Sequence, residues 1–294
     1  MDRGEVWKRW QQLIRQWRRE LRAYPRDHPA FVAPELRNTS GAPYWLRSER
    51  PSSLGVLLVH GFLSTPEELK PLARTLAVNG YSCLGVRLAG HGTSPLALAQ
   101  TQADDWLDSV LHAYELLSQE VQRVVVLGFS TGGLLSLYLA ARRLPGLQGV
   151  ISICAPVGFV DRSMELVPLL ETGRRLWQGL SGRQTPVFRL SYPEYPRINY
   201  RNMPLPALAG LQQLVGRYQL ELASVAAPVC LVQSRNDPVV APESATLLAQ
   251  ALPQDAEVVW VESLVHNLVR NEPQRWSRWV LQRLARWRAI VPAI

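Results

Sequence analysis

Short apolar segments alternate with segments of helical periodicity along most of the chain. The helical patterns cover 64–80, where Thr65 is the expected N-cap and Pro66 the first helical residue, then 101–120, a helix from Thr131, and 242–252. The strand-like runs are 54–62, 81–88, 123–129, 149–156, 227–234 and 257–263. Apolar strands separated by helices predict an α/β fold whose mostly parallel central sheet has helices on both faces.

This alternation stops between Val157 and Val225. Two helices are expected there, over 162–180 and 205–222, joined by a segment rich in proline and tyrosine. A connection of that length is unusual inside a compact sheet, so we expect an inserted helical cap that lies over it. The expected organisation is an N-terminal extension at 1–50, a core formed by 51–156 and 226–294, and a cap at 157–225.

The two ends of the chain carry amphipathic helical patterns rich in tryptophan and arginine. Near the N-terminus, an apolar stripe lies opposite Lys8, Arg15, Arg18, Arg19 and Arg22; its members are Trp7, Trp10, Ile14, Trp17 and Leu21. This helix could pack on the protein, make a peripheral contact with an anionic membrane, or pair with a second subunit. The similar stripe at 276–287 is expected to pack on the protein itself.

Composition limits the class of protein further. The chain has 294 residues, is 47% hydrophobic and has a formal net charge of +8, carried almost entirely by arginines spread along the sequence. No nucleic-acid-binding motif accompanies that charge, so a solvated surface is the preferred interpretation and no nucleic-acid partner is expected. The N-terminal pattern lacks the aliphatic core of a signal peptide, and no apolar segment reaches membrane-spanning length.

The cysteines indicate a reducing location. Cys83, Cys154 and Cys230 each lie in an apolar, strand-like run and show no metal-ligand spacing. Buried, reduced thiols in a cytoplasmic protein are therefore expected, with no metal site.

One serine lies at a constrained corner between a strand and a helix. The pentapeptide GFSTG, residues 128–132, follows the apolar run 123–129 and begins the helix at Thr131. A GxSxG sequence in this context forms a sharp turn that exposes the serine hydroxyl beside a helix N-terminus. An ordinary glycine-rich turn would carry the same letters, but the strand and helix favour Ser130 as a nucleophile.

A serine nucleophile needs a base and an acid to orient that base. Among the histidines, His28, His60, His91 and His112 lie too early or in the wrong element, whereas His266 follows the last strand, as the order serine, acid, histidine requires. Asp237 follows the preceding strand and is the preferred acid, although a turn aspartate can simply bond its own backbone. Glu243 and Glu262 are competitors, the first at a helix start and the second at a strand end.

The oxyanion that forms during acyl transfer needs hydrogen-bond donors fixed in advance. The backbone N–H of Thr131 follows the nucleophile directly, and the loop HGF at 60–62 brings the backbone N–H of Phe62 to the same edge of the sheet. We expect these two amides to form the oxyanion hole.

Together the segments LLVHGF, AGHGTSP, VVVLGFSTGG, SRNDPVV and SLVHN, in this order, resemble the α/β-hydrolase superfamily over residues 50–290. The resemblance is strongest to bacterial carboxylesterases and monoacylglycerol lipases with a small helical cap. It implies the same roles for Ser130, Asp237, His266 and the Phe62 and Thr131 amides, a structural role for His91 near the pocket, and no metal or organic cofactor.

The expected function is hydrolysis of carboxylic esters, either short or medium acyl esters or monoacylglycerols, through an acyl-enzyme. A serine at the nucleophile position argues against the dehalogenases and epoxide hydrolases of this superfamily, which use aspartate there. A thioesterase or a carbon–carbon bond hydrolase with the same triad is the alternative activity. A non-catalytic protein that binds a small molecule in the same fold is the alternative of a different class.

Overall fold

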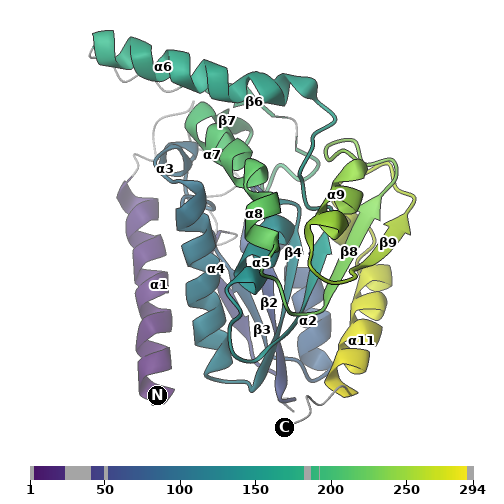
Figure 1. The fold of residues 1–294 in the computed structure, drawn as a ribbon. Helices are drawn as coiled ribbons and strands as arrows, with labels where there is room; N and C mark the ends of the chain where they lie inside the picture. The colour runs from purple at the N-terminus through teal and green to yellow at the C-terminus, as the bar shows by residue number, and fades with distance from the viewer. Residues whose placement is uncertain (1–2, 24–40, 50–51, 182–186, 192, 290–294) are drawn as a thin grey trace.

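The computed structural model describes residues 3–23, 41–49, 52–181, 187–191 and 193–289. Within these residues the main sheet has seven strands in the order β1-β3-β2-β4-β5-β8-β9 (Figure 1). Only β1 runs antiparallel to its neighbour. The strands are β1 (Tyr44–Leu46), β2 (Leu54–Val59), β3 (Cys83–Val86), β4 (Arg123–Phe129), β5 (Leu147–Ile153), β8 (Val229–Ser234) and β9 (Glu257–Val261). The prediction of a mostly parallel sheet is confirmed.

Helices cover both faces of this sheet. One face carries α2 (Lys70–Val78) and α11 (Pro273–Ala289), and the other carries α4 (Ala103–Ser118), α5 (Thr131–Ala141) and α9 (Glu243–Ala251). Short helical elements lie in the connections, namely η2 (Pro66–Glu68), α3 (Pro95–Ala99) and α10 (Leu268–Asn271). As predicted, Thr65 is the N-cap and Pro66 the first helical residue, although this first turn is the 3-10 helix η2 and the Thr65 side chain makes no capping bond.

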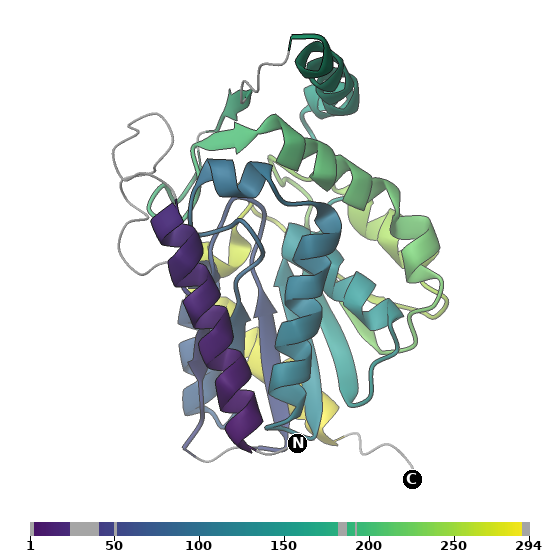
Figure 2. The ribbon, with the colours of Figure 1, turned by 90° about the vertical axis from the view of Figure 1, so that its left-hand side faces the viewer.

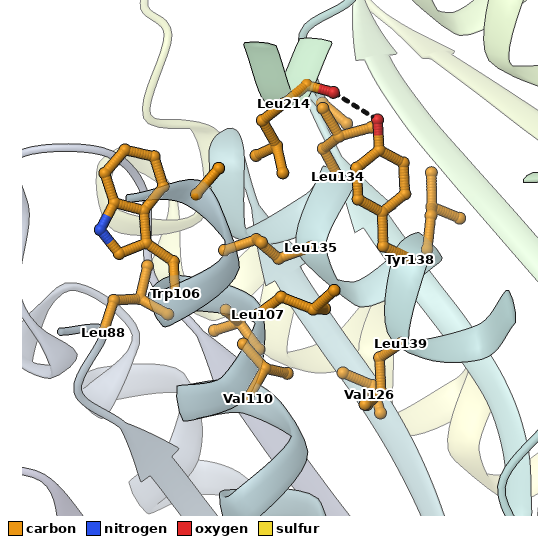
Figure 3. Close-up of a cluster of buried hydrophobic side chains, with 14 of the residues drawn as sticks. Leu88, Trp106, Leu107, Val110, Val126, Leu134, Leu135, Tyr138, Leu139 and Leu214 are labelled. Carbon is orange, nitrogen blue, oxygen red and sulfur yellow. Dashed lines mark hydrogen bonds between the residues drawn. The ribbon is translucent and has the colours of Figure 1, made fainter. Parts of the chain in front are cut away.

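Alternate residues of each strand pack in two separate hydrophobic clusters, one on each face of the sheet. Val124 and Val126 of β4 pack with α4 and α5, whereas Val125 and Leu127 pack with α2 and α11. Figure 3 shows part of the first cluster, in which Val126 lies among side chains of α4 and α5 and the Tyr138 hydroxyl donates to the Leu214 carbonyl. Because side chains alternate across a strand and both faces are covered, the strand segments are largely apolar.

In the described part of the segment 157–225 there are two longer helices, two short helical elements and one antiparallel pair of short strands. Its elements are η3 (Arg162–Leu166), α6 (Val167–Ser181), β6 (Phe188–Leu190), β7 (Asn202–Pro204), α7 (Leu205–Gly216) and α8 (Tyr218–Leu222). Figure 1 shows α6 as the outermost helix, with α7 between α6 and the rest of the molecule. The helix expected over 205–222 is interrupted at Arg217, and the one expected over 162–180 begins with the 3-10 turn η3. The antiparallel β6–β7 pair was not expected from the proline- and tyrosine-rich sequence.

Both terminal helices exist as expected. In α1 (Arg3–Ala23), which lies alongside α4 in Figure 2, half-buried Trp10 packs edge to face on Trp45, with ring centroids 5.7 Å apart. Trp7 is 52% exposed, and the side chains of Trp17, Leu21 and Arg22 lie outside the described residues. The predicted packing of the C-terminal helix is confirmed, because α11 buries Trp276, Val280 and Trp287.

No helix in the described ranges combines the length and apolar content needed to cross a membrane. Cys83, Cys154 and Cys230 are buried and unpaired, as expected.

Candidate active site

Ser130 lies at the turn between β4 and α5 with φ 54° and ψ −124°, a backbone conformation that L-residues rarely adopt. The flanking glycines make this turn possible. A Cβ atom on Gly128 would lie 2.0 Å from the Gly132 carbonyl oxygen, and one on Gly132 would lie 2.2 Å from the Val59 carbonyl oxygen. The Ser130 N–H donates to the Ile153 carbonyl at 2.7 Å, which fixes the turn on the neighbouring strand.

The side chains of Ser130, His266 and Asp237 form one hydrogen-bonded chain. The Nε2 atom of His266 lies 3.0 Å from the Ser130 Oγ, and its Nδ1 lies 3.0 and 2.9 Å from the two carboxylate oxygens of Asp237. An ionised carboxylate only accepts hydrogen bonds, so Nδ1 donates to Asp237 and Nε2 faces the serine hydroxyl, as a general base requires.

The arrangement of the strands explains why these three side chains meet. Asp237 follows β8 and His266 follows β9, and these two parallel strands pair up to their ends, where Ser234 faces Val261. The carboxyl ends of parallel strands therefore bring together residues that lie far apart in the sequence.

Asp237 is held by more than the imidazole. Its Oδ1 atom accepts the backbone N–H groups of Val239 at 2.9 Å and Val240 at 3.0 Å, so it also bonds its own turn. Burial raises the pKa of Asp237, but the His266 hydrogen bond and charge and these two amides outweigh burial and lower it. The competing Glu262 is exposed and binds the Asn236 amide at 2.8 Å, and Glu243 begins α9.

The other histidines that the structure describes take no part in this hydrogen-bonded chain. His112 is exposed on α4, and His28 lies outside the described residues. His60 and His91 are fully buried and pack against each other with ring centroids 5.2 Å apart. Burial lowers the pKa of His91 to about 4, and the His91 ring packs edge to face with the Phe62 ring. A neutral, packed imidazole beside the HGF loop agrees with the structural position that the resemblance implied for His91.

Phe62 and Thr131, whose backbone amides are expected to form the oxyanion hole, both line the pocket at Ser130. The Thr131 N–H is the first of helix α5, where no carbonyl of the helix is placed to accept it. Phe62 follows β2 in a loop that passes the nucleophile so closely that a Cβ atom on Gly61 would lie 3.3 Å from the Ser130 Cβ. Phe62, Ser130 and Thr131 line the same pocket.

This pocket has a volume of about 510 Å³ and lies between the sheet edge and the segment 157–225. That size suits a small organic ligand. Its apolar lining includes Phe159, Met164, Met203, Leu208 and Leu211, whereas Arg189, Glu194, Tyr195 and Asn199 supply polar groups.

Three further polar residues at this site were missed by the sequence analysis. Glu68 is buried and binds the Gly61 N–H and the Asn267 side-chain amide, and exposed Glu194 accepts the His266 N–H at 3.0 Å. Glu68 occurs in the sequence STPEEL, where two acids at a helix start are ordinary, and Glu194 lies in the irregular segment between β6 and β7. None of the three positions, Glu68, Glu194 and Asn267, carried a signal in the sequence alone.

Among the described residues, one group has metal-ligand atoms close together: Cys154, Asp237 and His266, whose ligand atoms lie within 4.8 Å of one another. Burial raises the pKa of the Cys154 thiol well above its usual value, and His266 and Asp237 already bond each other. A protonated thiol is a poor metal ligand, so this group fits a bound metal badly.

Two curated proteins are similar to most of this chain. A thermostable monoacylglycerol lipase from Bacillus sp. (strain H-257) is 31% identical over 220 residues, which cover 72% of this chain and 82% of the relative. A carboxylesterase from Bacillus subtilis (strain 168) is 28% identical over 221 residues, covering 74% and 86%.

Solved structures agree on the fold. The structure described under "LipS and LipT, two metagenome-derived lipolytic enzymes" has a TM-score of 0.72 at 23% identity, covering 84% of this chain and 98% of its own. A monoacylglycerol lipase from Paleococcus ferrophilus has a TM-score of 0.69 at 17% identity, with the same coverage. The family model described as serine aminopeptidase, S33 matches residues 51–274. With this match over most of its length, the chain belongs to the S33 family of α/β hydrolases.

Proposed function

We propose that this protein hydrolyses carboxylic esters through an acyl-enzyme on Ser130. The observation that carries the proposal is the hydrogen-bonded chain from Ser130 through His266 to Asp237. Ser130 and His266 line a pocket of about 510 Å³. The monoacylglycerol lipase and the carboxylesterase among its relatives support an ester substrate.

In the first half of the reaction, the Ser130 oxygen attacks the ester carbonyl while His266 Nε2 removes the hydroxyl proton. Asp237 holds the imidazole by its Nδ1–H and stabilises the imidazolium that forms. The backbone N–H groups of Phe62 and Thr131 donate to the oxyanion, and each such donor contributes on the order of 3 kcal/mol in the transition state. His266 then gives its proton to the departing alkoxide, which leaves the acyl group on Ser130.

In the second half, a water molecule takes the place of the alcohol. His266 removes a proton from the water, the hydroxide attacks the acyl-enzyme carbonyl, and the same two amides stabilise the second oxyanion. Collapse of this intermediate breaks the bond to Ser130, whose oxygen recovers a proton from His266. The carboxylic acid leaves and the serine is free again.

The proposed substrates are short or medium acyl esters or monoacylglycerols. The segment 157–225 acts in this proposal as a cap, because it contributes Met164, Met203, Leu208 and Leu211 to the apolar wall of the pocket. An apolar wall favours an acyl chain, and the polar groups of Arg189 and Asn199 offer hydrogen bonds to an alcohol.

The buried, unpaired cysteines support the proposed cytoplasmic location.

A series of p-nitrophenyl esters of increasing chain length tests the activity, with Ser130→Ala as the control. We expect turnover by the wild-type protein and a loss of about 10⁴-fold or more in the variant. Equal turnover by both proteins would contradict the proposal. Binding of esters without acylation would instead favour the non-catalytic alternative, and turnover restricted to thioesters would favour a thioesterase.

A further inference from the structure

Glu68 is a buried carboxylate that bonds the two loops flanking Ser130. It is 3% exposed, its Oε2 accepts the Gly61 N–H at 2.7 Å, and its Oε1 accepts the Asn267 Nδ2–H at 2.9 Å. Gly61 directly precedes Phe62, whose N–H is a proposed oxyanion donor. Asn267 directly follows His266, the proposed base.

We infer that Glu68 and Asn267 are a pair of positioning residues. They set the distance between the loop of Gly61 and Phe62, here called the oxyanion loop, and the loop of His266 and Asn267, here called the histidine loop. The inference rests on the proposed function, because it assigns the pair a task in that reaction. Neither side chain bonds Ser130, so both act through their neighbours in the chain.

The direction of the hydrogen bond between Glu68 and Asn267 follows from the other partner of Asn267. The Asn267 Oδ1 atom accepts the Arg270 N–H at 3.1 Å and thereby caps helix α10. The side-chain amide of Asn267 therefore cannot flip without losing that cap. Its Nδ2 must then point to Glu68, and Glu68 must offer one acceptor to each loop. A neutral glutamine in place of Glu68 has only one oxygen, so it would place an N–H₂ group against one of the two donors.

Other groups hold the same histidine loop from outside. The exposed Glu194 accepts the His266 N–H at 3.0 Å and the Asn267 N–H at 3.4 Å, and the Arg270 guanidinium donates to the Glu67 carbonyl at 2.9 Å. Glu68 is the buried member of this set. Burial raises the pKa of Glu68, and the Gly61 hydrogen bond opposes that rise. Burying a carboxylate is energetically unfavourable, so we infer that the site needs both acceptor oxygens of Glu68.

A reciprocal exchange tests the pair. Glu68→Gln alone leaves its N–H₂ group facing either the Asn267 N–H₂ group or the Gly61 N–H, and Asn267→Asp alone leaves two carboxylate oxygens facing each other. When both substitutions are combined, the oxygen of the new glutamine can accept the Gly61 N–H. Its N–H₂ group can donate to the new aspartate, whose other oxygen still caps α10. Glu67→Gln is the matched control, because the Glu67 side chain binds Lys70 at 2.8 Å on the half-buried surface.

Three measurements are made on all variants: kcat and KM for a soluble aryl ester, the rate at which an alkyl fluorophosphonate labels Ser130, and the thermal midpoint. We expect each single variant to lose about 10-fold to 100-fold in kcat and in labelling rate with little change in KM. The double variant should recover to within about threefold of wild type, and Glu67→Gln should match wild type.

Unchanged single variants would overturn the inference, as would a double variant whose loss is the product of the two single losses. If the single variants do not fold, the double variant must fold and react, and its failure would equally overturn the pairing. Labelling needs no ester turnover, so a wild-type protein that is labelled with this pattern but hydrolyses no ester would refute the proposed function and leave the pair standing.

Discussion

The imidazole of His266 lies 3.0 Å from the hydroxyl of Ser130, although 136 residues separate them in the sequence. This contact depends on the parallel pairing of β4, β5, β8 and β9, which brings the ends of these strands to one edge of the sheet. The sheet therefore sets the spacing of the site, and short loops present the reacting groups.

Asp237 should stabilise the fold as well as orient the imidazole. Because its folded pKa is lowered, its ionised form contributes stability that is fully present above the unfolded pKa of about 3.9. That contribution is lost as the pH falls through the folded pKa. We expect Asp237→Asn to lower the free energy of unfolding by about 2 kcal/mol at pH 7 and by clearly less at pH 3. Denaturant titrations at both pH values check this, and an equal loss at both would contradict it.

The turn at Ser130 should tolerate no side chain at its glycines. In Gly132→Ala, the new Cβ would meet the Val59 carbonyl oxygen at 2.2 Å, so we expect a loss of about 3 kcal/mol or more in stability. Gly173→Ala, in helix α6, is the control, because a Cβ there meets nothing within 4 Å and should stabilise by about 0.5–1 kcal/mol. Thermal unfolding of both variants decides the matter, and a fully stable Gly132→Ala protein would count against the geometry.

The three thiols should be unreactive in the folded protein. Burial raises the pKa of Cys230 to about 12, and burial also raises the pKa values of Cys83 and Cys154. We expect no release of chromophore from a disulfide reagent at pH 8 until guanidinium is added, and then reaction of all three cysteines. Rapid reaction of any thiol in the native protein would show that its burial is incomplete.

The N-terminal helix α1 should contribute to stability through Trp10. Its ring is half-buried against Trp45, whereas Trp7 on the same helix is 52% exposed. We expect Trp10→Ala to cost about 2 kcal/mol in the free energy of unfolding and Trp7→Ala less than about 0.5 kcal/mol. If Trp10→Ala were neutral while Trp7→Ala abolished sedimentation with anionic phospholipid vesicles, the membrane interpretation of this helix would replace packing.

The parts of the fold that were predictable are those set by local pattern. The buried strands are apolar on both faces, so β2, β4, β5 and β8 were visible as continuous runs, and the glycine spacing around Ser130 marked its turn. The order of Asp237 and His266 after successive strands sufficed to select them. Strand β1 was missed because three residues next to an extension carry no periodicity.

The contacts that depend on tertiary structure were not predictable in the same way. Glu68 and Asn267 lie 199 residues apart, and each looks ordinary in its local sequence. Glu194 follows the short strand β6, whose pairing with β7 was itself not foreseen. Polar partners that meet only when loops converge leave no spacing in the sequence to detect.

The most direct test of the central claim is to identify the residue that an ester acylates. The protein is mixed with a p-nitrophenyl ester, quenched in acid within milliseconds, digested and analysed by mass spectrometry. We predict an acyl group on Ser130 in the wild-type protein, and greatly slowed acylation when His266 is replaced by alanine. Acylation of a different residue, or ester hydrolysis that persists in Ser130→Ala at the wild-type rate, would contradict the account.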